Sequence, residues 1–209
     1  MRRIPWWTLV SSAGAPVLLI GGWTVAAGLQ PAGYDSIRDT ISALAGHGAT
    51  DRWVMTAGLA GLGVCHLVTS LGLRPAALPG RFALAIGGIA TLFVSALPLP
   101  RVGTSHAHGL VALVAFVALA AWPALAIRRE NHNTLGVRTG AAATTTLLVI
   151  VIWFGLSLWS GHLVGLSERC AAGAEALWPL LVVLSVMRRA RPSSTPRSDA
   201  PARRSPRHR

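Results

Sequence analysis

Apolar residues in this chain occur in long stretches, and polar residues gather in the shorter segments between them. A stretch of about 17 to 25 apolar residues is long enough to cross a hydrocarbon core of about 30 Å as an α-helix. The stretches of this length are 7–29, 53–73, 81–98, 107–127, 138–161 and 171–187. The pattern therefore predicts an all-α, polytopic membrane protein, a bundle of six transmembrane helices. Short connections between most of them predict that consecutive helices are antiparallel neighbours.

Composition agrees with this class, because only 12% of the residues are charged and 52% are hydrophobic. Soluble domains usually have about a quarter of their residues charged. We expect residues 1–187 to form one transmembrane domain. For the first stretch a cleaved signal peptide is the alternative, although the apolar run exceeds the 7–15 residues that are typical of one.

The basic residues predict the orientation of the bundle. All 19 are arginines, and with the N-terminus inside, 15 of them fall in inner segments. Cytoplasmic segments of membrane proteins carry an excess of basic residues. We therefore expect both termini in the cytoplasm, and the protein in the cytoplasmic (inner) membrane of a bacterium.

Residues 188–209 differ from the rest of the chain, being rich in arginine, proline and serine with almost no apolar residue. Such a segment cannot bury enough apolar surface to fold, so we predict a disordered cytoplasmic tail. Its arginines would bind the anionic headgroups of the lipid bilayer. The net charge of +12 is concentrated here and beside the apolar stretches. We accordingly expect no binding of nucleic acid.

Acids and histidines gather in the segments predicted to be outside. In the first of these, Asp35, Arg38, Asp39 and Ser42 are spaced i, i+3, i+4 and i+7. This spacing places them on one face of an α-helix. We predict a short amphipathic helix over residues 35–44 in the first outer loop. Asp39 and Ser42 then either point into a cavity between the helices or lie in solvent.

His106 and His108 stand where the fourth apolar stretch begins. Two imidazoles so close in sequence can bind a transition metal, and zinc suits such ligands. The pattern H-x-H is weak evidence, because residues at i and i+2 do not share a face of a helix. A divalent metal such as zinc is therefore only weakly predicted.

Glu168 and Glu175 are seven residues apart and so lie on one stripe of the last predicted helix. A carboxylate within the hydrocarbon region is costly unless it is paired, protonated or in contact with water. Glu175 is thus a candidate functional residue, and pairing with Arg169 or Arg38 is the structural alternative. His66, in the middle of the second stretch, is a weaker candidate.

Several of these segments together resemble a bacterial membrane family, the one described as domain of unknown function 998. The segments are Tyr34–Leu44, His106 with His108, Gly165–Arg169, Glu175 and Trp178–Pro179. The resemblance extends over residues 10–187 and leaves out the basic tail. It implies six spans and an extracytoplasmic polar motif, and it implies no activity.

Three classes of function fit these observations. The first is a non-catalytic lipid-binding or assembly protein, whose polar residues join the outer ends of the helices. The second is a membrane-embedded hydrolase or transferase that acts on a lipid at the outer leaflet. Its candidate catalytic residues are Asp39, Ser42, His108, Glu168 and Glu175. The third is a small-solute or proton-coupled carrier, in which Glu175 and His66 form an intramembrane relay. The chain has no internal repeat of the kind common in carriers.

Overall fold

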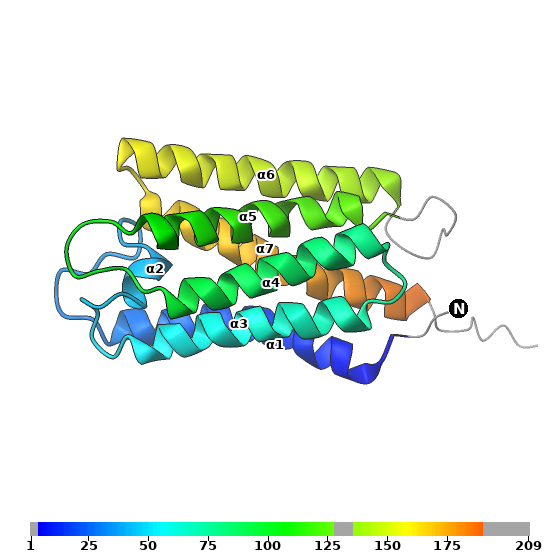
Figure 1. Cartoon of the computed structure of the whole chain (residues 1–209), viewed down its shortest axis with the longest axis horizontal. Coiled ribbons are helices and arrows are strands. Elements are labelled where there is room, and N and C mark those ends of the chain that lie inside the picture. The colour runs from blue at the N-terminus through cyan, green and yellow to red at the C-terminus, as the bar shows by residue number, and fades with distance from the viewer. Residues whose placement is uncertain (1–3, 128–135, 190–209) are drawn as a thin grey trace, which may run out of the picture.

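The computed structural model describes residues 4–127 and 136–189, and these form an all-α bundle (Figure 1). Its long helices are α1 (Trp6–Gly28), α3 (Trp53–Gly72), α4 (Leu78–Ala96), α5 (His106–Leu125), α6 (Val137–Ser160) and α7 (Val164–Arg189). A short helix, α2 (Ile41–Leu44), lies between α1 and α3. All six long helices have the length and apolar composition needed to span a membrane. The predicted six-helix transmembrane fold is confirmed, and the chain is a multi-pass membrane protein.

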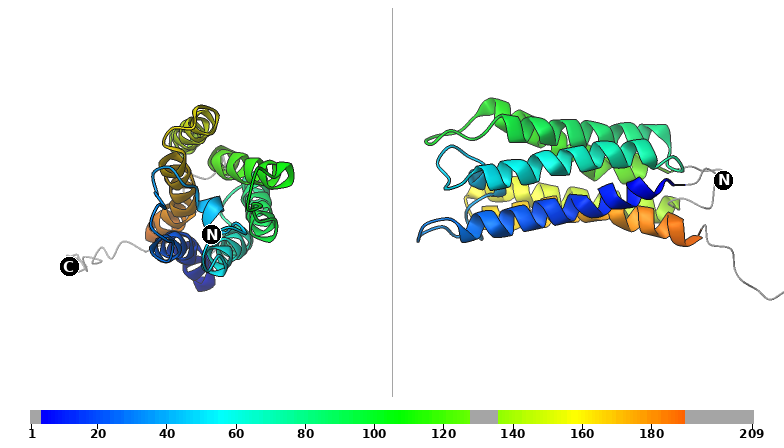
Figure 2. Two further views of the ribbon diagram at one scale, coloured as in Figure 1. Left: turned by 90° about the vertical axis from the view of Figure 1, so that its left-hand side faces the viewer. Right: turned by 90° about the horizontal axis from the view of Figure 1, so that it is seen from below.

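The long helices α1, α3, α4, α5 and α7 form a ring around a central space, and α6 packs outside this ring against α5 and α7 (Figure 2). Helices that are consecutive in the sequence pack against each other, and α7 closes the ring by packing on α1. The helix α2 lies over the central space at the end where α1 ends and α7 begins (Figures 1 and 2). We call this the α2 end of the bundle. The opposite end, where α1 begins and α7 ends, is called the terminal end.

Small residues allow neighbouring helices to approach closely, as expected where lipid provides no hydrophobic drive for association. A Cβ atom added to Gly63 of α3 would lie 2.7 Å from the carbonyl oxygen of Gly88 in α4. A Cβ atom on Gly88 would in turn lie 2.8 Å from the carbonyl oxygen of Gly63. The contact between α3 and α4 therefore depends on both glycines.

The short helix of the first loop is present but covers fewer residues than the predicted segment 35–44. Residues 36–38 form a turn, and the helix begins only after Thr40. Thr40 has an extended backbone (ψ 159°), and its Oγ1 accepts a hydrogen bond from the Ala43 amide at 2.9 Å. This is the geometry of a helix N-cap, which a threonine favours. The cap starts a new helix at Ile41 and separates it from the preceding turn.

The last helix begins earlier than the predicted span of 171–187. It starts at Val164, so Glu168 and Arg169 lie within its first two turns. It continues to Arg189, so the first two residues of the predicted tail are helical. The remainder of the predicted tail, 190–209, lies outside the described residues.

Candidate functional site

Glu168 connects α7 to α2 at the α2 end of the bundle. Its carboxylate is buried, with 4% of the residue exposed. Oε1 accepts a hydrogen bond of 2.9 Å from the Ser42 hydroxyl, and Oε2 accepts one from the Ile41 amide. The two oxygens therefore satisfy polar groups of the first turn of α2, which would otherwise lack partners in the interior.

Arg169 fixes the segment that precedes α2. Its Nη1 donates to the carbonyl oxygens of Ser36 at 2.7 Å, Asp39 at 2.8 Å and Gly165 at 2.9 Å. Its Nη2 donates to the hydroxyl of Tyr34. A Cβ atom at Gly165 would lie 2.2 Å from the Asp39 carbonyl oxygen, so the loop rests directly on the backbone of α7. Arg169 thus holds the first loop against α7, and we call Arg169 and its hydrogen-bond partners the loop clamp.

Asp39 takes part in the local structure of the same loop. Its Oδ2 accepts a hydrogen bond of 2.8 Å from the Asp35 amide. The Asp35 carboxylate in turn accepts one from the Ile37 amide at 2.8 Å and lies 3.7 Å from Arg38 in an exposed ion pair. Such bonds between an aspartate and nearby amides stabilise turns. The Asp39 carboxylate is therefore used within the turn, and it does not line the central cavity.

The two histidines at the start of α5 do not come together. His106 is exposed, whereas His108 is buried with 4% of the residue exposed. The Nδ1 atom of His108 lies 2.7 Å from the carbonyl oxygen of Leu97, at the end of α4. Within residues 4–127 and 136–189, no three histidine, cysteine, aspartate or glutamate side chains lie close enough to hold a metal ion. His108 therefore joins α5 to the end of α4.

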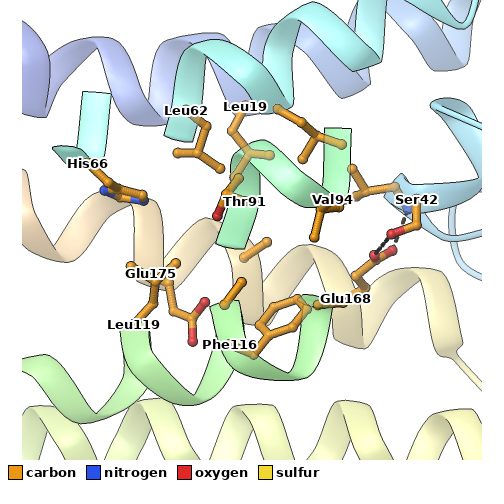
Figure 3. A pocket seen from close by; sticks show the side chains of 15 residues that line it. Leu19, Ser42, Leu62, His66, Thr91, Val94, Phe116, Leu119, Glu168 and Glu175 are labelled. Atoms are coloured by element: carbon orange, nitrogen blue, oxygen red, sulfur yellow. Dashed lines mark hydrogen bonds between the residues drawn. The ribbon is translucent and has the colours of Figure 1, made fainter. Parts of the chain in front are cut away.

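A cavity of about 50 Å³ lies inside the ring, below α2 (Figure 3). Its wall is mainly apolar, and its polar members are Ser42, His66, Thr91, Glu168 and Glu175. Figure 3 shows Ser42 and Glu168 at one end of the cavity and His66 at the other. The volume has room for about three or four water molecules. The cavity therefore brings together three of the predicted site residues, Ser42, Glu168 and Glu175.

Glu175 and His66 have no hydrogen-bond partners for atoms that are fully buried. Glu175 is 1% exposed, and its Oε1 accepts no hydrogen bond from any described residue. His66 is 0% exposed, and neither ring nitrogen has a partner in the described part of the chain. Buried polar groups are normally paired, and an unpaired buried carboxylate costs several kcal/mol. The bundle thus keeps two costly polar groups beside one cavity.

Buried hydroxyl groups continue from His66 towards the terminal end. Thr69 follows His66 by three residues on α3, and its Oγ1 lies 2.8 Å from the Ser11 Oγ of α1. Thr8, one turn before Ser11, has a fully buried hydroxyl with no partner among the described residues. Buried polar side chains therefore extend from Glu168 at the α2 end into the half of the bundle nearer the terminal end.

Two features of this site could not be predicted from the sequence. His66 was a candidate for an intramembrane relay, but no pattern indicated that both of its ring nitrogens lack a hydrogen-bond partner among the described residues. The second feature is Thr91, whose hydroxyl lines the cavity while donating to the Gly87 carbonyl oxygen at 2.8 Å. A threonine inside an apolar stretch has no pattern that distinguishes a cavity position from a lipid-facing one.

The residues of the cavity and of the loop clamp all fall within the range matched by one protein-family model. Its description is "Protein of unknown function (DUF998)", and the match covers residues 12–185. The chain belongs to the DUF998 family. The resemblance expected from the sequence is thereby confirmed, and the family range again leaves out the arginine-rich C-terminal segment. No curated protein and no solved structure matches the chain.

Proposed function

We propose that this DUF998 protein is a non-catalytic, proton-binding carrier whose intramembrane site consists of Glu175 and His66. One observation carries the proposal: a buried carboxylate without a hydrogen-bond partner among the described residues shares a cavity with an imidazole that also has none. Ionisable residues inside a membrane protein usually mark an ion or proton pathway. Because the cavity is small, its occupants are a proton and a few water molecules.

The positions of the other polar residues favour a carrier over an enzyme. Glu168, Asp39 and His108 each hold a loop or a helix end in place. The hydroxyl of Ser42 donates to a carboxylate that also accepts from a backbone amide, so Ser42 and Glu168 serve as a structural tie. The ionisable groups that line the cavity are Glu168, Glu175 and His66. Of these, Glu175 and His66 remain available for proton exchange.

A proton route is supported by the order of the buried polar groups along the bundle. Glu168 and Glu175 are seven residues apart on α7, which corresponds to about 10 Å along the helix axis. Water molecules in the cavity would bridge this separation, and Thr69 and Ser11 would continue the route beyond His66. A hydroxyl group can both donate and accept a hydrogen bond, as proton transfer requires. Polar groups are thus distributed along the bundle, as a carrier needs.

The setting of this function is part of the same proposal. We place the protein in a bacterial cytoplasmic membrane with both termini in the cytoplasm, so that the α2 end faces outwards. The distribution of arginines supports this orientation, since 15 of the 19 fall in segments on the predicted inner side, where basic residues are in excess. Protons would then enter beside Glu168 and reach Glu175 through the cavity.

Proton uptake into proteoliposomes tests the proposal. The purified protein is reconstituted with a pH-sensitive dye inside the vesicles, and a potassium diffusion potential, negative inside, drives proton entry. We expect the wild-type protein to acidify the interior faster than protein-free vesicles do. Glu175→Gln should lower the rate to that of protein-free vesicles, because an amide cannot take up the proton.

Asp51→Asn is the matched control for this experiment. Asp51 is an exposed acid at the α2 end of the bundle, and it does not line the cavity. Its replacement should leave proton uptake unchanged. Uptake by Glu175→Gln at the wild-type rate, or no uptake by the wild-type protein, would contradict the proposed function.

A further inference from the structure

A groove separates α6 from α7 in the half of the bundle nearer the terminal end. The two helices are joined by a tight turn at the α2 end, where Gly161 adopts a left-handed conformation (φ 74°). They diverge from this turn, and α6 lies apart from α7 at the terminal end (Figure 1). The groove has a volume of about 620 Å³. It is separate from the central cavity, and no described residue lines both.

The walls of the groove are apolar along most of its length. Small side chains on α6, such as Ala142 and Ala143, face Leu177 and Leu181 of α7. Among the described lining residues the one with a charged side chain is Arg138, which lies at the terminal end beside Thr139. The groove therefore has a long apolar part and a cationic end.

The length of the groove corresponds to one leaflet of a bilayer. On α6 it extends from Arg138 to Leu147, which are nine residues apart. At 1.5 Å per residue this is about 14 Å, close to half of a hydrocarbon core of about 30 Å. An acyl chain of the leaflet at the terminal end would lie along it, with its headgroup beside Arg138.

Charge at the terminal end favours an anionic headgroup. Arg138 is exposed, and the described residues provide no carboxylate that pairs with it. Arg74 and Arg188 also lie at this end of the bundle, whereas every described acid belongs to the α2 end or the central cavity. An anionic phospholipid would supply a negative charge to pair with Arg138 and an acyl chain to fill the apolar part of the groove.

We propose that the groove between α6 and α7 binds one anionic phospholipid of the leaflet at the terminal end, with its phosphate on Arg138. This site is independent of the proton site, and its test does not depend on proton transfer. A basic residue near a membrane surface contributes about 1 kcal/mol to the attraction of anionic lipid. The acyl chain adds apolar contact along the walls.

Native mass spectrometry of the full-length protein in detergent tests this proposal. Phosphatidylglycerol and phosphatidylcholine with identical acyl chains are titrated separately. We expect the wild-type protein to retain one phosphatidylglycerol molecule more tightly than phosphatidylcholine. Arg138→Gln should weaken binding of phosphatidylglycerol about fivefold, the equivalent of about 1 kcal/mol, and should abolish the preference. Ala142→Phe should prevent retention of both lipids by filling the groove.

Two control variants separate the groove from other basic and apolar surfaces. Ala141→Phe places the same bulk on an exposed position of α6 outside the groove, and Arg101→Gln removes an exposed arginine at the α2 end. Both should bind lipid as the wild-type protein does. Equal retention of the two lipids by the wild type, or equal effects of Ala142→Phe and Ala141→Phe, would overturn the proposal. Loss of phosphatidylglycerol binding in Arg138→Gln, with normal lipid binding in Ala142→Phe, would overturn the proposal as well. The lipid would then bind outside the groove.

Discussion

Glu168→Met is expected to lower the free energy of unfolding by about 3 kcal/mol. The substitution keeps the length of the side chain but replaces its carboxylate by an apolar group, so it removes the acceptors of the Ser42 hydroxyl and the Ile41 amide. A buried donor that loses its partner costs about 1–3 kcal/mol. Thermal unfolding in detergent, followed by circular dichroism, measures the effect.

Local opening of the first loop should accompany this loss of stability. Arg38 is exposed in that loop, so trypsin should cleave after it faster in Glu168→Met than in the wild-type protein. Glu168→Gln is the control, because its side-chain carbonyl can still accept one of the two hydrogen bonds. Wild-type stability and wild-type cleavage of Glu168→Met would refute the role of Glu168 as an anchor of α2.

The same substitution seven residues later should have the opposite effect on stability. Glu175→Met is expected to raise the free energy of unfolding by about 2 kcal/mol, since it replaces an unpaired buried carboxylate by an apolar group of similar size. The helix, the burial of the original side chain and the new side chain are closely matched between the two variants. The difference in unfolding free energy between the two variants therefore measures the effect of the hydrogen-bond partners that Glu168 has and Glu175 lacks.

Thermal unfolding of both variants in one detergent gives the comparison directly. A higher free energy of unfolding for Glu175→Met, together with loss of proton uptake, would identify Glu175 as a residue retained for function at a cost in stability. A decrease in the free energy of unfolding as large as that of Glu168→Met would mean that Glu175 has a structural partner. The carrier proposal would then lose its main support.

The sequence predicted the six spans because each is a long apolar run, and the length needed to cross a bilayer leaves few alternatives. It placed the start of the last span too late, at residue 171, because the apolar run begins only after the charged residues Glu168 and Arg169. The side chains of both residues form hydrogen bonds with the first loop, more than a hundred residues earlier in the chain. A hydropathy pattern contains no information on such a contact.

The first loop shows how a correct periodicity can still overstate a helix. Asp35, Asp39 and Ser42 have helical spacing, and the Asp39 amide does donate to the Asp35 carbonyl oxygen at 2.7 Å. Thr40 then interrupts the helix by capping the next one. Side chains that bond nearby amides compete with a continuous helix, and the outcome depends on the contacts that α7 makes.

The candidate site was predicted in part. Glu175 was recognisable because a carboxylate in an apolar stretch is rare and costly. The absence of partners for His66 was not recognisable, because it depends on how α3 and α7 are arranged around the cavity. Asp39 and His108 are as polar as Glu175, and only their hydrogen bonds show that they hold the structure together.

Infrared difference spectroscopy shows whether Glu175 exchanges a proton with water inside the bundle. Spectra of the reconstituted protein are recorded at neutral and at acidic pH, and one is subtracted from the other. We expect a carbonyl band of a protonated carboxylic acid that is present in the wild-type protein and in Asp51→Asn and absent from Glu175→Gln. Identical difference spectra of the wild type and Glu175→Gln would contradict the claim.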